Sequence, residues 1–506
     1  MPVNDATIPD GTWLAAIDIG SNSFHMVVAR VVLGHLRVVD RLRETVRLAW
    51  GLKANGDLDP EAKQRALDCL SRFGERIRSI STVHVRAIAT NTVRQLRNPQ
   101  AFLDDAEAAL GHAIEVVSGR EEARLIYLGV AHGLPPKKTR RLVIDIGGGS
   151  TEFIIGEGFT ALERESLQMG CVASTRRFFP DGKITEKRWE SARTELALQF
   201  QQFATAYREL GWKEAIGSSG TAKAIAEMLA GPDLPAGTIT REGVDKLARR
   251  LIDIKNIDDI DLPGVSSDRR PVIAGGLLVM QTCMNELGIE RMQSCDTAMR
   301  EGVLYDMLGR ATQRDPRDGA IAAYAVRYGI DTAHAACVEE TALELFDQVA
   351  EAWELDVDSR RMLSWAARIH ELGLVISHSQ HQKHAAYILA NSDMDGFSRQ
   401  EQQCLATLVR CQRRTISRSM LGQFQGKQSR EMLRLVVLLR LAILLHRSHA
   451  RETLPPLTLT VSDNDIQLSL PEAWLSEHAL TRADLATERG ELEEVGLRLS
   501  VVSTTA

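Results

Sequence analysis

The sequence predicts a duplicated α/β fold, followed by an all-helical region and a small terminal α/β unit. The duplication is predicted by two segments that each contain an apolar strand, an Asp, a Gly/Ser turn and a second β-branched strand. They are residues 14–29 (LAAIDIGSNSFHMVVA) and 142–156 (LVIDIGGGSTEFIIG). Asp18 and Asp145 in these segments lie 127 positions apart, which is the length of a domain and not of a solenoid repeat.

Each of the two segments is predicted to form a β-hairpin whose turn uses positive-φ backbone, which Gly tolerates best. After the first hairpin, alternating strand and helix patterns predict an α/β domain with a mixed sheet. In chain order we expect a strand at 36–48, a helix at 60–80, a strand at 83–89, a helix ending near 110, a strand at 114–117 and a helix at 118–133.

The second half repeats this plan from residue 142 to about 308. Beyond residue 314, helical periodicity with few turn signals continues to about 449. After a Pro-Pro pair, period-two alternation predicts strands at 457–461, 465–470 and 497–502. We therefore predict four parts: half-domain I at 1–134, half-domain II at 135–311, a helical domain at 312–454 and a small α/β unit at 455–506.

The composition is typical of a soluble globular protein, with 44% hydrophobic and 25% charged residues in 506. A net charge of −6 provides no general attraction to nucleic acid or membrane, so an anionic ligand must be held by local groups. The start of the chain lacks the pattern of a signal peptide, and no run of about 18 apolar residues predicts a membrane span. Seven scattered cysteines predict reduced thiols in the cytoplasm, not a disulfide framework or a zinc site.

Three loops predict a phosphate site. Residues 18–23 and 145–152 combine tight Gly/Ser turns, which orient backbone N–H groups toward an anion, with an Asp that can hold a metal ion or orient water. One such loop is often only a hairpin turn, but two with the same Asp-x-Gly start favour a shared function. Residues 217–220 form a third loop that leads into a helix, whose N-terminus attracts anions. Three such loops match the actin-like (ASKHA) plan, in which phosphate loops face each other across a cleft.

These motifs resemble those of the exopolyphosphatase/guanosine-pentaphosphate phosphohydrolase (Ppx/GppA) family. The similar segments are residues 18–26, 118–129, 145–152, 217–221 and 299–304. The resemblance extends over residues 13–310, and the helical remainder looks like that of a long-form bacterial exopolyphosphatase. It implies a hydrolase that acts on phosphoanhydride bonds.

The resemblance also implies the roles of individual residues. It assigns the general base to Glu122, which without the resemblance would be interpreted as a solvated glutamate in the first turn of a helix. The neighbouring Glu121 completes a Ser118-x-x-Glu pattern that predicts a capping box and hence a structural role. Asp145 and Glu152 are expected to hold Mg²⁺, and K⁺ is expected as an activator. The residues expected to bind phosphate are Ser21, Asn22, Ser23, Arg94, Gly147, Gly148, Gly149, Ser150, Gly217, Ser218 and Gly220, with Lys223 as a further candidate.

The implied function is release of terminal orthophosphate from long-chain inorganic polyphosphate by Mg²⁺-assisted in-line attack of water. The alternative within the family is hydrolysis of the 5′-phosphate of guanosine pentaphosphate (pppGpp), with pppGpp or ppGpp as ligand. The triple glycine ending at Gly149, and Asp296 upstream of the Arg300-Glu-Gly motif, favour the polyphosphatase branch. The resemblance further implies a cytoplasmic homodimer that associates peripherally with the inner membrane, without nucleic acid or integral membrane contact.

Two functions of other classes stay open from the sequence. An actin-like sugar or acetate kinase would need an ATP site and an acceptor pocket, and phosphate release without an acceptor would exclude it. A non-enzymatic actin-like assembly protein or chaperone would bind ATP tightly without hydrolysing polyphosphate.

The helical region contains a histidine-rich segment. Ile369-His-Glu-Leu-Gly373 is followed by His378, His381 and His384, a pattern that resembles the metal-dependent His-Asp (HD) phosphohydrolase fold. Glu371 stands where that fold has a metal-binding Asp, so we expect a degenerate, non-catalytic HD-like domain.

Overall fold

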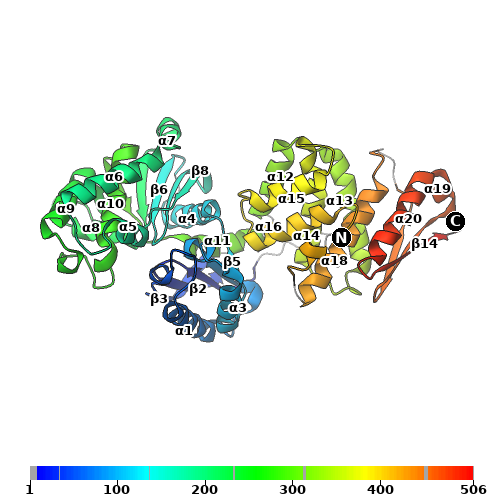
Figure 1. Ribbon diagram of the computed structural model, residues 1–506, viewed down its shortest axis with the longest axis horizontal. Helices are drawn as coiled ribbons and strands as arrows, with labels where there is room; N and C mark the ends of the chain where they lie inside the picture. The colour runs from blue at the N-terminus through cyan, green and yellow to red at the C-terminus, as the bar shows by residue number, and fades with distance from the viewer. Residues whose placement is uncertain are drawn as a thin grey trace. The chain divides into compact units, whose positions relative to one another are not determined.

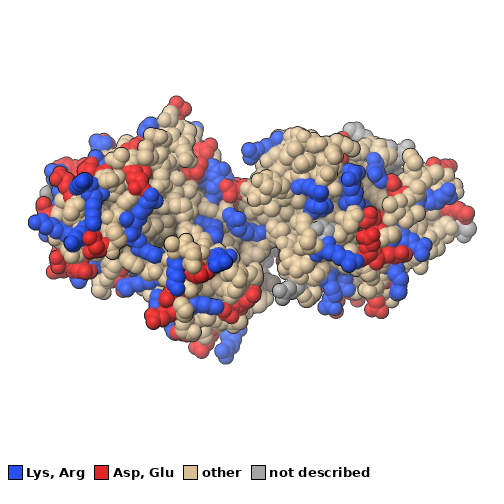
Figure 2. Space-filling view, viewed as in Figure 1, with Lys and Arg blue, Asp and Glu red and all other residues tan. Residues whose placement is uncertain are grey.

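The computed structural model describes residues 8–504, except 34, 136, 232–233, 312–314, 417, 425 and 450–453. The chain forms two compact units, Met1–Asp315 and Pro316–Ala506, which we call the N-terminal unit and the C-terminal unit. On the face shown in Figure 2, basic and acidic side chains are interspersed across both units, in keeping with the small net charge.

The first sheet of the N-terminal unit is mixed, with the strand order β3-β2-β1-β4-β5 (Figure 1). Two helices, α1 and α3, pack on this sheet in one hydrophobic core. Both helices start with a capping side chain followed by Pro, since Asp59 accepts from the N–H of Ala62 and Asn98 from that of Ala101. The elements are β1 (Trp13–Ile19), β2 (Phe24–Val32), β3 (His35–Glu44), η1 (Leu48–Gly51), α1 (Pro60–Ile77), η2 (Thr82–His84), β4 (Val85–Ala89), α2 (Asn91–Arg94), α3 (Pro99–Leu110), β5 (Ile114–Val116) and α4 (Gly119–Gly133).

The second sheet repeats the plan, with the order β10-β11-β9-β6-β7-β8. Its central hairpin and the helices α5 to α10 contribute to a second hydrophobic core. The elements are β6 (Arg141–Ile146), β7 (Thr151–Glu157), β8 (Thr160–Leu167), α5 (Cys171–Phe178), α6 (Glu186–Phe200), α7 (Ala204–Leu210), β9 (Glu214–Ser218), α8 (Ser219–Met228), β10 (Thr238–Thr240), α9 (Arg241–Ile254), η3 (Ile257–Asp259), α10 (Arg270–Leu287), β11 (Arg291–Ser294) and α11 (Met299–Ala311).

The predicted duplication is present in the structure. In both sheets the first strand of the hairpin pairs antiparallel with the second and parallel with a later strand. Each hairpin has a four-residue turn, 20–23 in the first and 147–150 in the second. The prediction that these turns need positive φ was wrong, because none of their residues has positive φ. The strand expected at 36–48 ends at Glu44, and the chain then turns through Arg47, at φ 56°, into η1.

Helices α4 and α11 join the two sheets of the N-terminal unit. Their apolar side chains form a shared core with residues of β1, β2, β6, β7 and β9. The two helices approach so closely that a Cβ on Gly129 would lie 2.0 Å from the carbonyl oxygen of Ala298, and one on Gly302 would lie 1.8 Å from that of Leu125. Neither position has room for a side chain, so the two glycines set the spacing of these helices.

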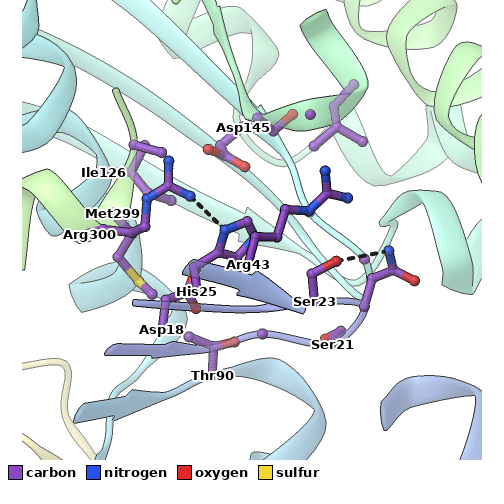
Figure 3. A pocket seen from close by; sticks show the side chains of 18 of the residues that line it. Asp18, Ser21, Ser23, His25, Arg43, Thr90, Ile126, Asp145, Met299 and Arg300 are labelled. Carbon is purple, nitrogen blue, oxygen red and sulfur yellow. Dashed lines mark hydrogen bonds between the residues drawn. The ribbon is translucent and has the colours of Figure 1, made fainter. Parts of the chain in front are cut away.

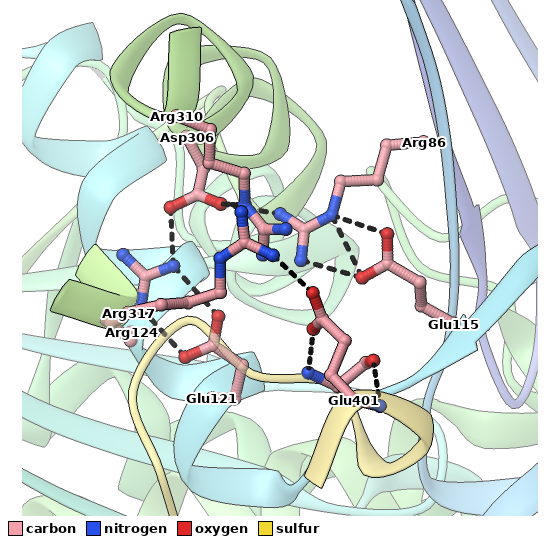
Figure 4. Close-up of polar contacts among 9 residues, drawn as sticks. Arg86, Glu115, Glu121, Arg124, Asp306, Arg310, Arg317 and Glu401 are labelled. Carbon is pink, nitrogen blue, oxygen red and sulfur yellow. Dashed lines mark hydrogen bonds and ion pairs between the residues drawn. The ribbon is translucent and has the colours of Figure 1, made fainter. Parts of the chain in front are cut away.

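A buried ion-pair network strengthens this junction (Figure 4). Asp306 of α11 accepts from Arg86 of β4 at 2.6 Å and from Arg124 of α4 at 2.5 Å. Arg124 also donates twice to Glu121 at 2.8 Å. The Ser118 hydroxyl accepts from the N–H of Glu121, which caps the start of α4 as predicted. The Glu121 side chain has a second structural role, because it pairs with Arg124 in this network.

The C-terminal unit combines helices with a three-stranded sheet of order β12-β13-β14, and both contribute to one hydrophobic core. The buried guanidinium of Arg440 in α18 donates to both carboxylate oxygens of Glu488 in α20, at 2.5 and 2.8 Å. The elements are α12 (Pro316–Arg327), α13 (Thr332–Val349), α14 (Val357–Ile369), η4 (Leu372–Val375), α15 (His381–Asn391), α16 (Arg399–Cys411), α17 (Arg418–Leu421), α18 (Gly426–Leu445), β12 (Thr458–Ser462), β13 (Asp465–Pro471), α19 (Glu472–Glu477), α20 (Ala479–Glu493) and β14 (Arg498–Thr504).

The search for membrane spans found no candidate: within the described ranges, every helix is too short or too polar to cross a bilayer.

Candidate active site

A cavity of about 330 Å³ lies in the N-terminal unit where the two hairpin turns meet. Both turns, 20–23 and 147–150, line it. Figure 3 labels Ser21 and Ser23 of the first turn, and Asp145 at the end of the strand that leads into the second. The charged residues of its wall are the acidic Asp18, Glu122, Asp145 and Asp296 and the basic Arg41, Arg43, Lys223, Arg269 and Arg300.

The carbonyl groups of the second turn are hydrogen-bonded to the backbone at the start of α5. The carbonyl oxygens of Gly147 and Gly148 accept from the first N–H groups of α5, at 2.9 Å each, and Gly149 accepts from Gly170 at 3.1 Å. The N–H of Gly147 closes the turn by donating to the carbonyl oxygen of Ser150 at 3.0 Å. Contrary to the prediction, this N–H is therefore not free to bind phosphate. The N–H groups of Gly148 and Gly149 donate no hydrogen bond within the part of the chain that the structure describes. Free donors of this kind form an anion-binding nest.

The first turn is held in the same manner. The carbonyl oxygen of Ser21 accepts from the N–H of Ala49 at 2.9 Å, and that of Asn22 accepts from Arg47 at 2.8 Å. The Ser21 hydroxyl also accepts from Thr92 at 2.8 Å. The segment after β3 therefore supports the first turn as the start of α5 supports the second.

Glycine in the second turn is required by the close approach of the two turns. A Cβ on Gly148 would lie 3.0 Å from the Cβ of Ser21. On Gly149 it would lie 2.4 Å from Asn91 Oδ1 and 3.0 Å from Ser21 Oγ. Larger residues would therefore push the two half-domains apart at the site where phosphate is expected.

The third loop contributes to the wall in part. Gly220 and Lys223 line the cavity, and a Cβ on Gly220 would overlap the guanidinium of Arg269. Gly217 and Ser218 do not line it, because Gly217 packs against Met292 and Ala222, and Ser218 donates to the carbonyl oxygen of Thr297 at 3.1 Å. The close packing at Gly220 brings Arg269 to the start of α8.

Glu122 lines the cavity from the first turn of α4. Its Oε2 accepts from Nη1 of Arg94 at 3.1 Å, and the same nitrogen lies 2.7 Å from the carbonyl oxygen of Val117. Arg94, predicted to bind phosphate, does not line the cavity, and its observed contact is with Glu122. Burial raises the pKa of Glu122, while Arg94 opposes the shift.

Four carboxylates around the cavity influence one another. Burial raises the pKa of Asp18 to about 7 and that of Asp145 to about 6, and Glu122 adds to both shifts. Burial also raises the pKa of Glu152 well above its usual value, with contributions from Glu122 and Asp145. This concentration of buried negative charge is unfavourable unless cations neutralise it.

Asp145 and Glu152 fit the magnesium ion that was predicted for them. They face each other in the β6–β7 register, so their side chains start on the same face of the sheet, about 4.5–5.5 Å apart at Cβ. Glu152 Oε1 accepts from Ser166 at 2.8 Å, whereas its buried Oε2 has no hydrogen-bond partner among the described residues. Unpaired carboxylate oxygens are the ligands that Mg²⁺ prefers.

Basic side chains also line the cavity. Arg300 Nη1 lies 2.9 Å from Nδ1 of His25 (Figure 3). Burial, together with Arg300 and Arg43, lowers the pKa of His25 well below its usual value, so this ring is neutral and accepts from Arg300. Guanidinium groups recognise phosphate oxygens with two parallel donors.

The structure thus brings most of the predicted site residues together. The cavity wall contains Ser21, Asn22, Ser23, Glu122, Asp145, Gly147, Gly148, Gly149, Ser150 and Gly220, and it excludes Arg94, Glu152, Gly217 and Ser218.

Most basic residues of the cavity wall were not predicted from the sequence motifs. Arg41 and Arg43 alternate along β3 and so share one face of the strand, a period-two signal that could have indicated them. Arg300 lies in a segment that resembles the family, but no role was assigned to it. Arg269 has no such local signal.

Comparison with known proteins agrees with this site. The description "Ppx/GppA phosphatase family" matches residues 27–311, and "Ppx/GppA phosphatase, domain III" matches residues 317–489. Guanosine-5′-triphosphate,3′-diphosphate pyrophosphatases of Photobacterium profundum and Aeromonas hydrophila are 35% and 37% identical to this chain. The alignments cover 96% and 95% of this chain and 97% of each relative.

Among solved structures, an exopolyphosphatase from Cytophaga hutchinsonii is 25% identical with a TM-score of 0.52, covering 59% of this chain and 98% of that one. The predicted actin-like fold is confirmed, and the protein is a hydrolase of phosphoanhydride bonds. With matches over nearly its full length, the chain belongs to the Ppx/GppA phosphatase family.

Proposed function

We propose that this protein hydrolyses the terminal 5′-phosphate of pppGpp and releases ppGpp and orthophosphate. The observation that carries the proposal is the similarity, over 96% of the chain, to relatives named for guanosine-5′-triphosphate,3′-diphosphate. The sequence motifs favoured polyphosphate, with pppGpp as the alternative, and the relatives support the alternative better.

The cavity supports this proposal by its size and its lining. At about 330 Å³ it lies at the small end of ligand pockets, so it suits a short phosphate chain with the nucleoside at its mouth. The N–H groups of the two turns would bind the terminal phosphate, and the basic wall around Arg43 and Arg300 would bind the remaining phosphates.

In the proposed reaction, water attacks the terminal phosphorus in line with the bridging oxygen. A bond forms between the water oxygen and phosphorus as the bond to the bridging oxygen breaks, and ppGpp leaves with that oxygen and its negative charge. Glu122 orients the water and accepts its proton, and Arg94 holds the Glu122 carboxylate. Mg²⁺ held by Asp145 and Glu152 would neutralise charge on the phosphate oxygens.

Exopolyphosphatase activity is the second candidate, favoured by the similarity to the Cytophaga hutchinsonii enzyme. The two sequence features taken to favour it have structural explanations that apply to either substrate. Gly149 accommodates the close approach of Asn91, and Asp296 forms an ion pair with Lys223 at the cavity wall. Neither feature therefore separates polyphosphate from pppGpp.

The test is phosphate release from pppGpp, long-chain polyphosphate and ATP in parallel, with and without Mg²⁺. We expect the highest kcat/KM with pppGpp, and ppGpp as its nucleotide product. A higher kcat/KM with polyphosphate would replace the proposal by the second candidate. Phosphate transfer to a sugar or acetate without release to water would overturn both.

A further inference from the structure

We infer that the C-terminal unit contains a transition-metal site formed by His334, His370 and Glu371. Each of these residues offers one ligand atom, and the three atoms all lie within 4.8 Å of one another. His334 lies in the first turn of α13, His370 caps the end of α14, and Glu371 precedes η4. The site is separate from the cavity of the N-terminal unit, and the inference does not depend on the proposed function.

His370 is in the protonation state that a metal ligand needs. Its Nδ1 lies 2.7 Å from the carbonyl oxygen of Ala367, so Nδ1 carries the proton and Nε2 keeps its lone pair. A ring N–H that donates to a backbone carbonyl is the usual support of a metal-binding histidine.

His449 supports the other two ligands from outside the group. Its ring stacks on that of His334 with centroids 3.8 Å apart, and its Nε2 lies 3.4 Å from Glu371 Oε1. These contacts restrict the orientation of the His334 ring and of the Glu371 carboxylate. Side chains in this position fix the geometry of metal ligands without binding the ion themselves.

The donor set points to Zn²⁺ and not to Mg²⁺. Two neutral imidazoles and one carboxylate suit zinc, whereas magnesium prefers oxygen ligands alone. Zinc bonds of about 2.0–2.2 Å place tetrahedral ligand atoms roughly 3.4 Å apart, which is within the 4.8 Å limit that contains the three atoms. Three protein ligands leave the fourth position for water.

The expectation of a degenerate domain rested on Glu371 in place of Asp. The longer Glu side chain still brings a carboxylate oxygen to the two imidazoles. Replacing Asp by Glu therefore changes the reach of the ligand but keeps the charge and the donor atom.

The experiment measures Zn²⁺ binding to the full-length, metal-free protein by calorimetry, with Co²⁺ absorption spectra as a report of ligand geometry. We expect one Zn²⁺ per chain at this site and a tetrahedral Co²⁺ spectrum. His334→Ala and Glu371→Gln should each weaken Zn²⁺ binding at least about tenfold and remove the tetrahedral spectrum. His334 is only half-buried and Gln is close to Glu in shape, so both variants should fold.

His378→Ala is the matched control, since His378 is an exposed histidine seven residues after Glu371. It should bind Zn²⁺ like the wild type. Repeating the titration in Asp145→Asn separates binding at the cavity carboxylates, because the site inferred here should be unaffected. Equal Zn²⁺ affinity in wild type, His334→Ala and Glu371→Gln would overturn the inference, as would an equal loss in His378→Ala.

Discussion

The cavity of the N-terminal unit and the histidine group of the C-terminal unit both collect titratable side chains, but burial acts on them in opposite directions. In the cavity, burial raises the pKa of carboxylates such as Asp18 and Asp145, which favours binding of cations that replace protons. In the histidine group, burial lowers the pKa of His370 and leaves a neutral donor. The first arrangement suits Mg²⁺ and phosphate, and the second suits a softer metal ion.

The two regions also differ in how the chain builds them. The cavity is assembled from turns between paired strands, and within the described part of the chain the N–H groups of Gly148 and Gly149 have no other acceptor and can bind an anion. The histidine group is assembled at helix ends, where Asp331 accepts from the N–H of His334 and Gln412 donates to the carbonyl oxygen of His370, so the donors are side chains. We propose that hydrolysis depends on the N-terminal unit alone.

The largest effect is expected from Glu122→Gln, which removes the proton acceptor from the cavity. We expect kcat to fall by about 10²–10⁴-fold with little change in KM, because the base acts on water and not on the phosphates. Steady-state kinetics with pppGpp would measure this, with Glu163→Gln on an exposed position of β8 as the matched control. Near-normal turnover in Glu122→Gln would mean that another group activates the water.

Gly149→Ala should have the next largest effect, because its Cβ would lie 2.4 Å from Asn91 Oδ1. Separating the two turns by a fraction of an ångström should lower kcat/KM by up to about 10²-fold while the protein stays folded. Gly490→Ala is the control, since a Cβ at this helical position in the C-terminal unit has open space around it. An unchanged kcat/KM for Gly149→Ala would show that the closeness of the turns is not needed for activity.

Arg300→Gln tests the basic wall. A hydrogen bond from a charged donor contributes about 1.5–3 kcal/mol, so we expect KM to rise about 10- to 100-fold, with a smaller change in kcat. Arg250→Gln makes the same change of charge at an exposed position of α9 and should leave KM unaltered. Equal increases in KM for both variants would indicate a general effect of net charge instead of local contacts.

The smallest expected effect concerns stability and pH. Because the pKa values of Asp18 and Asp145 are raised to about 7 and about 6, the folded metal-free protein keeps protons that the unfolded chain loses above about pH 4. Its free energy of unfolding should therefore decrease as the pH rises from about 4 to about 7, and then level off.

Mg²⁺ should offset this loss, raising the Tm of the wild type by a few degrees at pH 8 and less at pH 5. Calorimetry with and without Mg²⁺ would measure both values, and Asp145→Asn should reduce both the pH dependence and the Mg²⁺ effect. A Mg²⁺-induced Tm shift of the same size in Asp145→Asn would place the ion elsewhere.

The duplicated hairpins, the Gly/Ser turns and the change to helical periodicity after residue 314 could be predicted from the sequence, because each depends on patterns within a few tens of residues. The position of Glu122 at the cavity was also expected, although only through the family resemblance. The local pattern predicted the wrong backbone conformation for the turns. Glycine is required at position 149 because the side chain of Asn91, 58 residues earlier, lies too close for a Cβ, and not because the backbone has positive φ.

Only the tertiary structure decided which distant side chains share the cavity and which form the histidine group. Arg43, Arg269 and Arg300 lie in three separate segments, and their common wall depends on how β3, α10 and α11 pack around the two hairpins. His334 reaches His370 and Glu371 in the same way, from another helix. Hydrophobic periodicity determines which face of an element is buried, but the partner of that face is selected by packing across the whole unit.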